Sequence, residues 1–296
     1  MRPPAEAIGS LAVIVGGIAL LILVGVEAAL VYAAWRYRAA RVAGPVRQTY
    51  GHTRLEVAWT IAPAVVLAVV FAFMLATMVE ITGATPAGEP VLRVKAIGHQ
   101  WWWEYRYGDV VSANELHIPV GTIVDLELSS ADVIHSFWVP PLAGKIDMIP
   151  GQTNRLRLFA RAPGTFEGQC AEFCGVEHAW MRIRVVALTR EDYERWLANE
   201  SRGASQGGEG ERVFMANICV SCHTVRGTAA AGTSGPDLTH VGARATLGAG
   251  VLPNDVAAMR GWLADPQHFK PGSFMPRVPL SDADLDALAA YLGSLK

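Results

Sequence analysis

Four side chains that can bind soft metal ions lie close together in the middle of the chain. Cys170, Cys174, His178 and Met181 fall within 12 residues, and a further imidazole is available at His135. Thiolate, imidazole and thioether ligands together favour copper. A mononuclear blue-copper site uses two histidines, one cysteine and a weak methionine, so this set contains one surplus thiolate. The sequence therefore predicts two copper ions bridged by both sulfurs.

Two other interpretations of this cysteine pair remain open from the residues alone. A disulfide between Cys170 and Cys174 would suit an oxidising compartment, but it leaves His178 and Met181 without a role. A structural zinc site formed by both cysteines, His178 and His135 is chemically sound. Met181 argues against zinc, because zinc sites in proteins use thiolate, imidazole and carboxylate ligands.

The second cysteine pair belongs to a different motif. Cys219-Val-Ser-Cys222-His223 matches the C-x-x-C-H signature of covalent haem attachment. In that chemistry both cysteines anchor the porphyrin and His223 is the proximal iron ligand. Without the histidine, the same pair would also suit a redox dithiol or half of a zinc site. The complete motif predicts a c-type haem.

The other axial ligand of this haem should be a methionine or a histidine. Met275 lies 52 residues after the histidine of the motif, in a segment rich in proline and glycine that can present a thioether from a loop. His240 and His268 are the alternatives. Met215 lies too close to the motif, and Met259 falls within an expected helix. We therefore expect Met275, and His/Met ligation suits electron transfer because it leaves no open coordination position.

A run of three tryptophans lies in residues 99–105. Alternation along a strand would place Trp101 and Trp103 on one face and Trp102 on the other. We therefore expect at least one large ring to be exposed, as aromatic docking surfaces are. The alternative is a strand packed on both faces.

Two long apolar segments precede all of these motifs. Residues 8–34 contain one charge, Glu27, and residues 57–79 contain none. Each segment exceeds the roughly 20 residues that cross a bilayer. A cleaved signal peptide is the alternative for the first segment, but its apolar run is long and only Arg2 provides a basic region before it. We predict two membrane-spanning helices.

The connection between these segments is basic, and it predicts their orientation. It carries one acid, Glu56, and five arginines: Arg36, Arg38, Arg41, Arg47 and Arg54. By the positive-inside rule this connection is cytoplasmic, so the N-terminus and everything after Glu80 lie outside. In a bacterium that space is oxidising.

The rest of the chain divides into two modules. Short β-branched runs predict strands at 91–97, 117–119, 123–128, 155–159 and 181–186, which indicate a sandwich or barrel. A short helix capped by Thr189 follows, within a domain of residues 91–199. Residues 200–208 have the composition of a flexible linker. Residues 209–296 predict a small helical domain, with helices at 255–264 and after the capping residue Ser281.

Composition agrees with this division of the chain. The 296 residues are 51% hydrophobic and only 18% charged, against about 25% charged in an average soluble domain. The apolar excess is concentrated in the N-terminal region, residues 1–81. A net charge of −2 gives no reason to expect a nucleic-acid partner.

Residues 8–200 resemble subunit II of cytochrome c oxidase, and residues 209–296 resemble a class I cytochrome c domain, as fused to that subunit in some bacteria. The resemblance is carried by residues 56–63, 98–105, 135–140, 145–151 and 170–181. It implies a multidomain fold with a two-helix transmembrane hairpin, an all-β cupredoxin-like domain and an all-α cytochrome c domain.

The resemblance also implies roles for individual residues. The dinuclear copper centre of the family, CuA, would be held by His135, Cys170, Cys174, His178, Met181 and the carbonyl of Glu172. The Glu172 carboxylate would reach a magnesium ion at the border with subunit I. Trp101 matches the tryptophan that receives electrons, and Glu56 matches an acid at the mouth of a proton channel. The carbonyl of Pro236 would orient His223. Trp102 departs from the usual tyrosine, which puts an electron route through a hydroxyl there in doubt.

From this resemblance we expect the electron-input subunit of a respiratory haem-copper oxidase in the bacterial inner membrane, with both soluble domains on the periplasmic side. Its partners would be subunit I, subunit III and a donor, either cytochrome c or quinol-cytochrome c reductase. Oxygen would be reduced to water in subunit I, with proton pumping. The alternatives are the small subunit of a CuA-containing nitric oxide reductase and a membrane-tethered copper-delivery protein. A quinol oxidase subunit II lacks the copper ligands that are present here.

Overall fold

The computed structural model describes residues 2–38, 48–82, 91–204 and 207–296. They form two compact units, one made of the N-terminal helices and one that begins after them. Arg41 and Arg47 of the basic connection lie outside the described residues, as do residues 83–90 and residues 205–206 of the expected linker.

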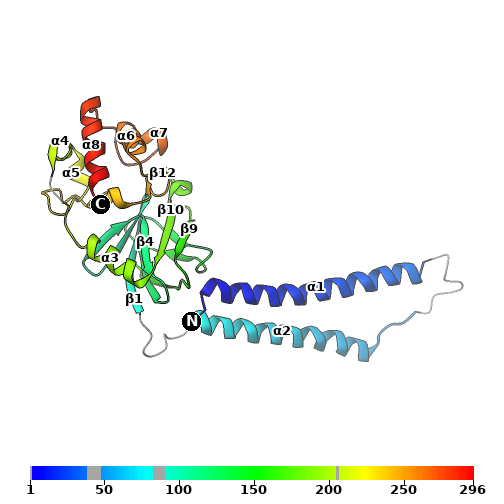
Figure 1. The fold of residues 1–296 in the computed structure, drawn as a ribbon. Coiled ribbons are helices and arrows are strands. Elements are labelled where there is room, and N and C mark those ends of the chain that lie inside the picture. Colours follow the sequence, from blue (N-terminus) through cyan, green and yellow to red (C-terminus); the bar gives the residue numbers. More distant parts are fainter. Residues whose placement is uncertain (1, 39–47, 83–90, 205–206) are drawn as a thin grey trace. The chain divides into compact units, whose positions relative to one another are not determined.

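The N-terminal unit is a pair of long helices that pack side by side, α1 (Pro4–Arg36) and α2 (Thr53–Thr82) (Figure 1). Both are apolar around their whole circumference, and their large side chains are exposed. The Arg2 guanidinium pairs with the Glu80 carboxylate at 2.6 Å, which joins the start of α1 to the end of α2. The helices are therefore antiparallel, and each is long and apolar enough to cross a bilayer.

The β-rich domain contains two five-stranded sheets. The first has the order β3-β2-β1-β5-β8, with the bounds β1 (Val91–His99), β2 (Trp102–Tyr107), β3 (Val110–Ala113), β5 (Ile123–Ser130) and β8 (Asn154–Leu158). The second has the order β4-β10-β9-β6-β7, with the bounds β4 (Glu115–Pro119), β6 (His135–Trp138), β7 (Ile146–Met148), β9 (Gly164–Cys170) and β10 (Arg182–Leu188). Two pairs are parallel, β1 with β5 and β4 with β10, and the other pairs are antiparallel. The predicted strands are all present.

Alternation along the strands fills the space between the sheets. In β5, Val124, Leu126 and Leu128 are fully buried and alternate with Asp125 and Glu127. A period of two is what a strand with one buried face requires. The same core contains larger residues from both sheets: Trp103, Tyr105, Leu116, Phe137, Met148 and Ile183. Helix α3 (Arg190–Glu200) follows β10, and its predicted cap is confirmed because the Thr189 side chain accepts from the Asp192 amide.

The C-terminal domain is helical, with a small core of its own. Its helices are α4 (Gly208–Ala216), α5 (Cys219–Cys222), α6 (Val256–Ala264), α7 (Pro266–Phe269) and α8 (Asp282–Ser294), and two short strands, β11 (Thr246–Leu247) and β12 (Leu252–Pro253), pair with each other. Ser281 caps α8 as predicted, by accepting from the Asp284 amide. Helices α4 and α8 approach closely at Gly210, where a Cβ atom would lie 2.1 Å from the Ala287 carbonyl oxygen.

Candidate metal and haem sites

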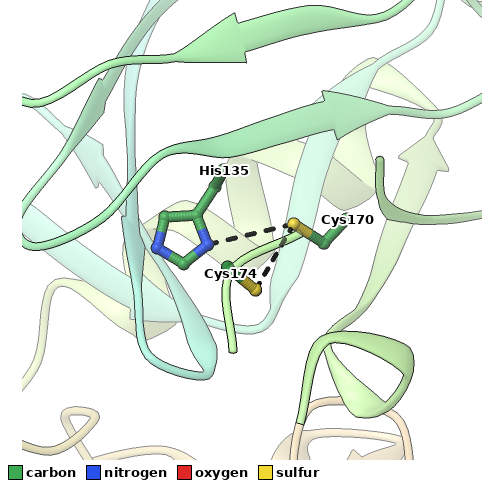
Figure 2. Close-up of side chains that lie close together, drawn as sticks. All are labelled: His135, Cys170 and Cys174. Atoms are coloured by element: carbon green, nitrogen blue, oxygen red, sulfur yellow. Dashed lines mark hydrogen bonds between the residues drawn. The ribbon is translucent and has the colours of Figure 1, made fainter. Parts of the chain in front are cut away.

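The two sheet strands β6 and β9 bring the first predicted ligands together. They are antiparallel neighbours, with Phe137 opposite Cys170, so His135 and Cys170 approach each other at one end of the pair. Nδ1 of His135 lies 3.9 Å from Cys170 Sγ, which lies 3.8 Å from Cys174 Sγ (Figure 2). All three side chains are buried, and their ligand atoms lie within 4.8 Å of one another.

The other predicted ligands come from the loop between β9 and β10. His178 begins the short 3-10 helix η2 (His178–Trp180), and Met181 directly precedes β10. Nδ1 of His178 lies 3.6 Å from Cys174 Sγ, and Met181 Sδ lies 3.9 Å from the same sulfur. The carbonyl of Glu172 lies 3.3 Å from Cys170 Sγ. The fold thus gathers all of the side chains that the sequence singled out for copper.

This donor set fits copper better than the alternatives. The Sγ–Sγ distance of 3.8 Å is far beyond the roughly 2.0 Å of a disulfide, and both thiols are free. Met181 is fully buried and aims its thioether at the cluster, where a zinc site would have no use for it. Hydrogen bonding with the Cys174 thiol lowers the pKa of Cys170 strongly, although burial opposes this, and a thiolate is the form that binds metal.

Two supporting residues around this cluster, Asp132 and Gln100, were not identified from the sequence. Asp132 Oδ1 lies 2.8 Å from His135 Nε2, and Asp132 also accepts from the Gln100 amide at 2.7 Å. The Gln100 side chain and the Trp101 indole N–H both donate to the Cys174 carbonyl, at 2.7 and 3.0 Å. The sequence offered one signal, the spacing of three residues between Asp132 and His135. The contacts of residues 100 and 101 depend on tertiary structure alone.

The expectation of an exposed tryptophan is wrong. Trp101, Trp102 and Trp103 are 7%, 9% and 0% exposed. Strand β2 begins at Trp102, so Trp101 lies in the turn before it and the assumed alternation does not apply. Trp102 stacks on His99 with ring centroids 4.1 Å apart, and the Trp101 ring contacts Phe274 of the helical domain at 4.9 Å. The alternative of aromatic residues packed on both faces is the one that the structure supports.

The helical domain contains a cavity of about 300 Å³ at the C-x-x-C-H motif. Cys219, Cys222 and His223 line it, as does Met275. Much of the remaining wall is apolar and comes from several helices and loops: Phe214, Leu238, Leu263, Leu288 and Leu292. An apolar pocket with two cysteines, an imidazole and a thioether on its wall fits a covalently attached haem.

The orientation of His223 agrees with a ligand role. Its Nδ1 lies 2.8 Å from the Pro236 carbonyl, which is the contact that the resemblance implied. An N–H at Nδ1 leaves Nε2 unprotonated and able to bind a metal ion, since a neutral imidazole has one donor and one acceptor. Burial lowers the pKa of His223 despite this hydrogen bond, so the ring is neutral.

The two histidines considered as alternatives to Met275 do not line the cavity. His240 is buried, and its Nε2 lies 3.1 Å from the Arg202 carbonyl. His268 is exposed and lies in α7. Met259 lies in α6, as expected, and is buried in the core of the helical domain, where it also lines the cavity. Met275 comes from an irregular loop, as predicted.

The remaining predicted site residue, Glu56, lies in the first turn of α2. Its side chain accepts from the His52 amide at 3.1 Å, and its carbonyl accepts from the Thr60 hydroxyl. It is exposed.

Comparison with known proteins defines the class to which each part of the chain belongs. Residues 3–77 match the model of the cytochrome c oxidase subunit II transmembrane domain, residues 110–188 match that of the periplasmic domain of the same subunit, and residues 208–296 match the cytochrome c model. The chain is therefore a membrane protein with a copper-binding type of β domain and a cytochrome c domain.

Two relatives that align over most of their length agree with this assignment. The chain is 39% identical to cytochrome c oxidase subunit 2 of Alkalihalophilus pseudofirmus over 261 residues, which cover 84% of this chain and 75% of the relative. It is 30% identical to the Bacillus subtilis subunit 2, over 90% of this chain and 82% of the relative. The periplasmic domain of subunit II from Bradyrhizobium japonicum aligns at 33% identity over 37% of this chain and 92% of that one, with a TM-score of 0.36. The chain belongs to the cytochrome c oxidase subunit II family.

Proposed function

We propose that this chain is the electron-input subunit of a respiratory haem-copper oxidase. Electrons from a donor, cytochrome c or quinol-cytochrome c reductase, reach haem c, then a dinuclear CuA centre, and then subunit I. Oxygen is reduced to water in subunit I, with proton pumping. Subunit III is a further partner.

The geometry described above supports the following residues as those that would hold the two groups. His135, Cys170, Cys174, His178, Met181 and the Glu172 carbonyl hold copper. Cys219 and Cys222 attach haem, and His223 and Met275 bind its iron. When bound, both groups supply one-electron redox chemistry. The protein buries His135, Cys170, Cys174 and Met181. It also fixes the imidazoles of His135 and His223, each by a hydrogen bond on one ring nitrogen.

One observation supports the route of electrons between the two groups. The cavity lined by Cys219, Cys222 and His223 is also lined by Gln100 and Trp101 of the β-rich domain. The Trp101 indole is hydrogen-bonded to the carbonyl of Cys174, a predicted copper ligand. A single side chain therefore borders the haem cavity and contacts the copper loop, which supports Trp101 as the residue through which electrons arrive.

Other features extend the proposal. We place both soluble domains, residues 91–199 and 209–296 with the linker 200–208 between them, on the periplasmic side of the bacterial inner membrane. The chain crosses that membrane twice, within residues 1–81. Glu56 stands at the mouth of a proton channel, and the Glu172 carboxylate binds magnesium at the border with subunit I. Carboxylate oxygen suits that hard cation.

Electron paramagnetic resonance of the purified full chain tests the copper assignment. One unpaired electron shared equally between two copper nuclei gives a hyperfine pattern that differs from that of a single copper. We expect the shared pattern, together with the absorption of covalently bound low-spin haem. A single-copper pattern, or zinc as the only metal found by elemental analysis, would refute the dinuclear centre.

A further inference from the structure

A buried lysine connects the two soluble domains. Lys270 follows α7 in the helical domain, and its side chain is 5% exposed. Its Nζ lies 3.1 Å from the Oε2 atom of Glu177, whose side chain is 1% exposed. The same Nζ donates to the Trp101 carbonyl at 3.0 Å. Both acceptors belong to the β-rich domain. The ammonium group of this helical-domain lysine therefore has its two contacts in the other domain.

The sequence positions of these partners relate the contact to both sites. Glu177 immediately precedes His178, in the loop between β9 and β10 that also contains Cys174. Lys270 begins the irregular loop that leads to Phe274 and Met275. One ion pair thus joins the loop that carries copper ligands to the loop that carries the axial methionine of the haem.

Apolar contacts nearby also bring these two loops together, but they fix the relative orientation of the loops less strictly than the contacts of Lys270. Phe274 packs on the Trp101 ring at a tilt of 35°. At Gly272 a Cβ atom would lie 2.7 Å from Cγ2 of Val176. Apolar packing of this kind is non-directional. The Lys270 ammonium donates a charge-assisted hydrogen bond to the Trp101 carbonyl and forms an ion pair with Glu177. A charge-assisted hydrogen bond is directional, so the contacts of Lys270 can fix the orientation of the two loops.

Burying these two charged side chains costs free energy unless they are paired with each other. Lysine and glutamate are almost never fully buried unless they are paired. Burial lowers the pKa of Lys270, and the pairing with Glu177 opposes that effect. Removing one partner of a buried pair leaves an uncompensated charge, which is strongly unfavourable. We therefore expect the two loops to shift relative to each other when either partner is lost.

We propose that Lys270 is a positioning residue for electron transfer between the domains. By pairing with Glu177 and the Trp101 carbonyl, it holds the Met275 loop against the copper loop at one fixed geometry. The proposal rests on the proposed function, because it presumes that electrons pass from haem to copper.

The experiment uses the full chain, loaded with haem and copper. The Lys270→Met variant removes the positive charge and keeps a side chain of similar length. Glu177→Gln leaves a carbonyl acceptor for the ammonium. Lys95→Met is the matched control, because Lys95 is an exposed lysine on β1. Photochemical reduction of the haem, followed by absorbance at the haem and copper bands, gives the rate of transfer between the domains. Spectra of both centres, recorded first, establish that each variant is loaded.

We expect Lys270→Met to slow this transfer about tenfold or more, because small misplacements of reacting groups are costly, and Lys95→Met to leave it unchanged. Glu177→Gln should slow it less, and the double variant should be no slower than Lys270→Met, since both changes act on one contact. A rate in Lys270→Met equal to that of the parent protein, or additive losses in the double variant, would overturn the positioning role.

The salt dependence of the transfer rate in the unaltered protein is a second test, and it does not require that any variant folds. A buried pair is screened much less than an exposed one, so we expect the parent rate to stay constant between about 0.05 and 0.5 M salt. A parent rate that falls steeply with salt would contradict the proposal. If the parent protein shows no transfer from haem to copper at all, the proposed function fails, which is distinguishable from every outcome above.

Discussion

The carboxylate of Asp132 lies 2.8 Å from Nε2 of His135, on the side of the ring opposite to the cysteines. This contact places the imidazole proton on Nε2, so that the lone pair of Nδ1 faces Cys170. Burial raises the pKa of Asp132, but hydrogen bonds from His135 and from the amides of Gln100 and Val133 outweigh it, and the carboxyl is ionised. Asp132 therefore fixes both the tautomer and the orientation of His135, a proposed copper ligand.

We predict that Asp132→Asn weakens copper binding about 10–100-fold, the usual effect of removing the group that orients a metal-bound histidine. Competition with a copper chelator, followed by the visible absorption of the copper centre, measures the affinity. Asp109→Asn is the control, because Asp109 is exposed in the turn between β2 and β3. Equal affinity in Asp132→Asn and Asp109→Asn would show that the ring is held by its packing alone.

A second prediction concerns the haem histidine. A Cβ atom on Gly235 would lie 2.7 Å from Cε1 of His223, so the glycine lets the backbone approach the ring. We expect Gly235→Ala to displace the imidazole from the Pro236 carbonyl and to destabilise the helical domain by about 1–3 kcal/mol, as overpacking does. Partial high-spin haem absorption and a lower thermal midpoint would report it. Gly293→Ala is a suitable control, since a Cβ atom there meets nothing within 4 Å.

The side chains of the proposed copper site could be grouped from the sequence because four of them are close together in the chain. A cysteine pair, a histidine and a methionine within one loop restrict the chemistry without any knowledge of the fold. His135 was predictable only by its residue type and by the resemblance, and the pairing of β6 with β9 explains why it belongs to the site. Asp132 and Gln100 were missed because their roles depend on hydrogen bonds across segments that the sequence does not connect.

The tryptophan run shows the opposite case, in which a local pattern misled. Alternation assumes that a strand begins before Trp101, but the chain turns at residues 100 and 101 and β2 begins one residue later. Burial of Trp101 also depends on Phe274, which lies far along the chain in another domain. Exposure at a contact between domains cannot be predicted from the periodicity of one strand.

A third prediction concerns acid stability and His117. Its ring stacks on Trp196 with centroids 4.3 Å apart, and burial lowers its pKa to about 4. Because this lies below the roughly 6.5 of an exposed histidine, the folded state binds the proton less tightly than the unfolded state. The stability is fully present above about pH 6.5 and falls as the pH drops toward 4, by about 3 kcal/mol in total.

The measurement is the thermal or denaturant stability of the β-rich domain between pH 7 and 4, followed by tryptophan fluorescence of the full chain in detergent. His117→Phe keeps a ring against Trp196 and removes the titrating group. We expect this variant to lose about 3 kcal/mol less than the parent protein over that range. Parallel pH curves for the two proteins would assign the acid sensitivity to other groups.

The last prediction concerns a second contact between the domains, at Glu115 on β4. This buried carboxylate accepts from the amides of Ala245 and Thr246 at 2.9 and 3.1 Å through a single oxygen. Glu115→Ala should raise the hydrogen-exchange rates of these two amides about 10–100-fold, because the loss of an acceptor costs roughly 1–3 kcal/mol.

Glu115→Gln should preserve most of the protection from exchange at these amides, since a carbonyl oxygen remains as acceptor. Glu167→Ala removes an exposed glutamate from β9 and should leave both amides protected. If exchange at residues 245 and 246 is the same in Glu115→Ala and Glu167→Ala, the amides are protected by the helical domain itself and Glu115 does not hold the domains together.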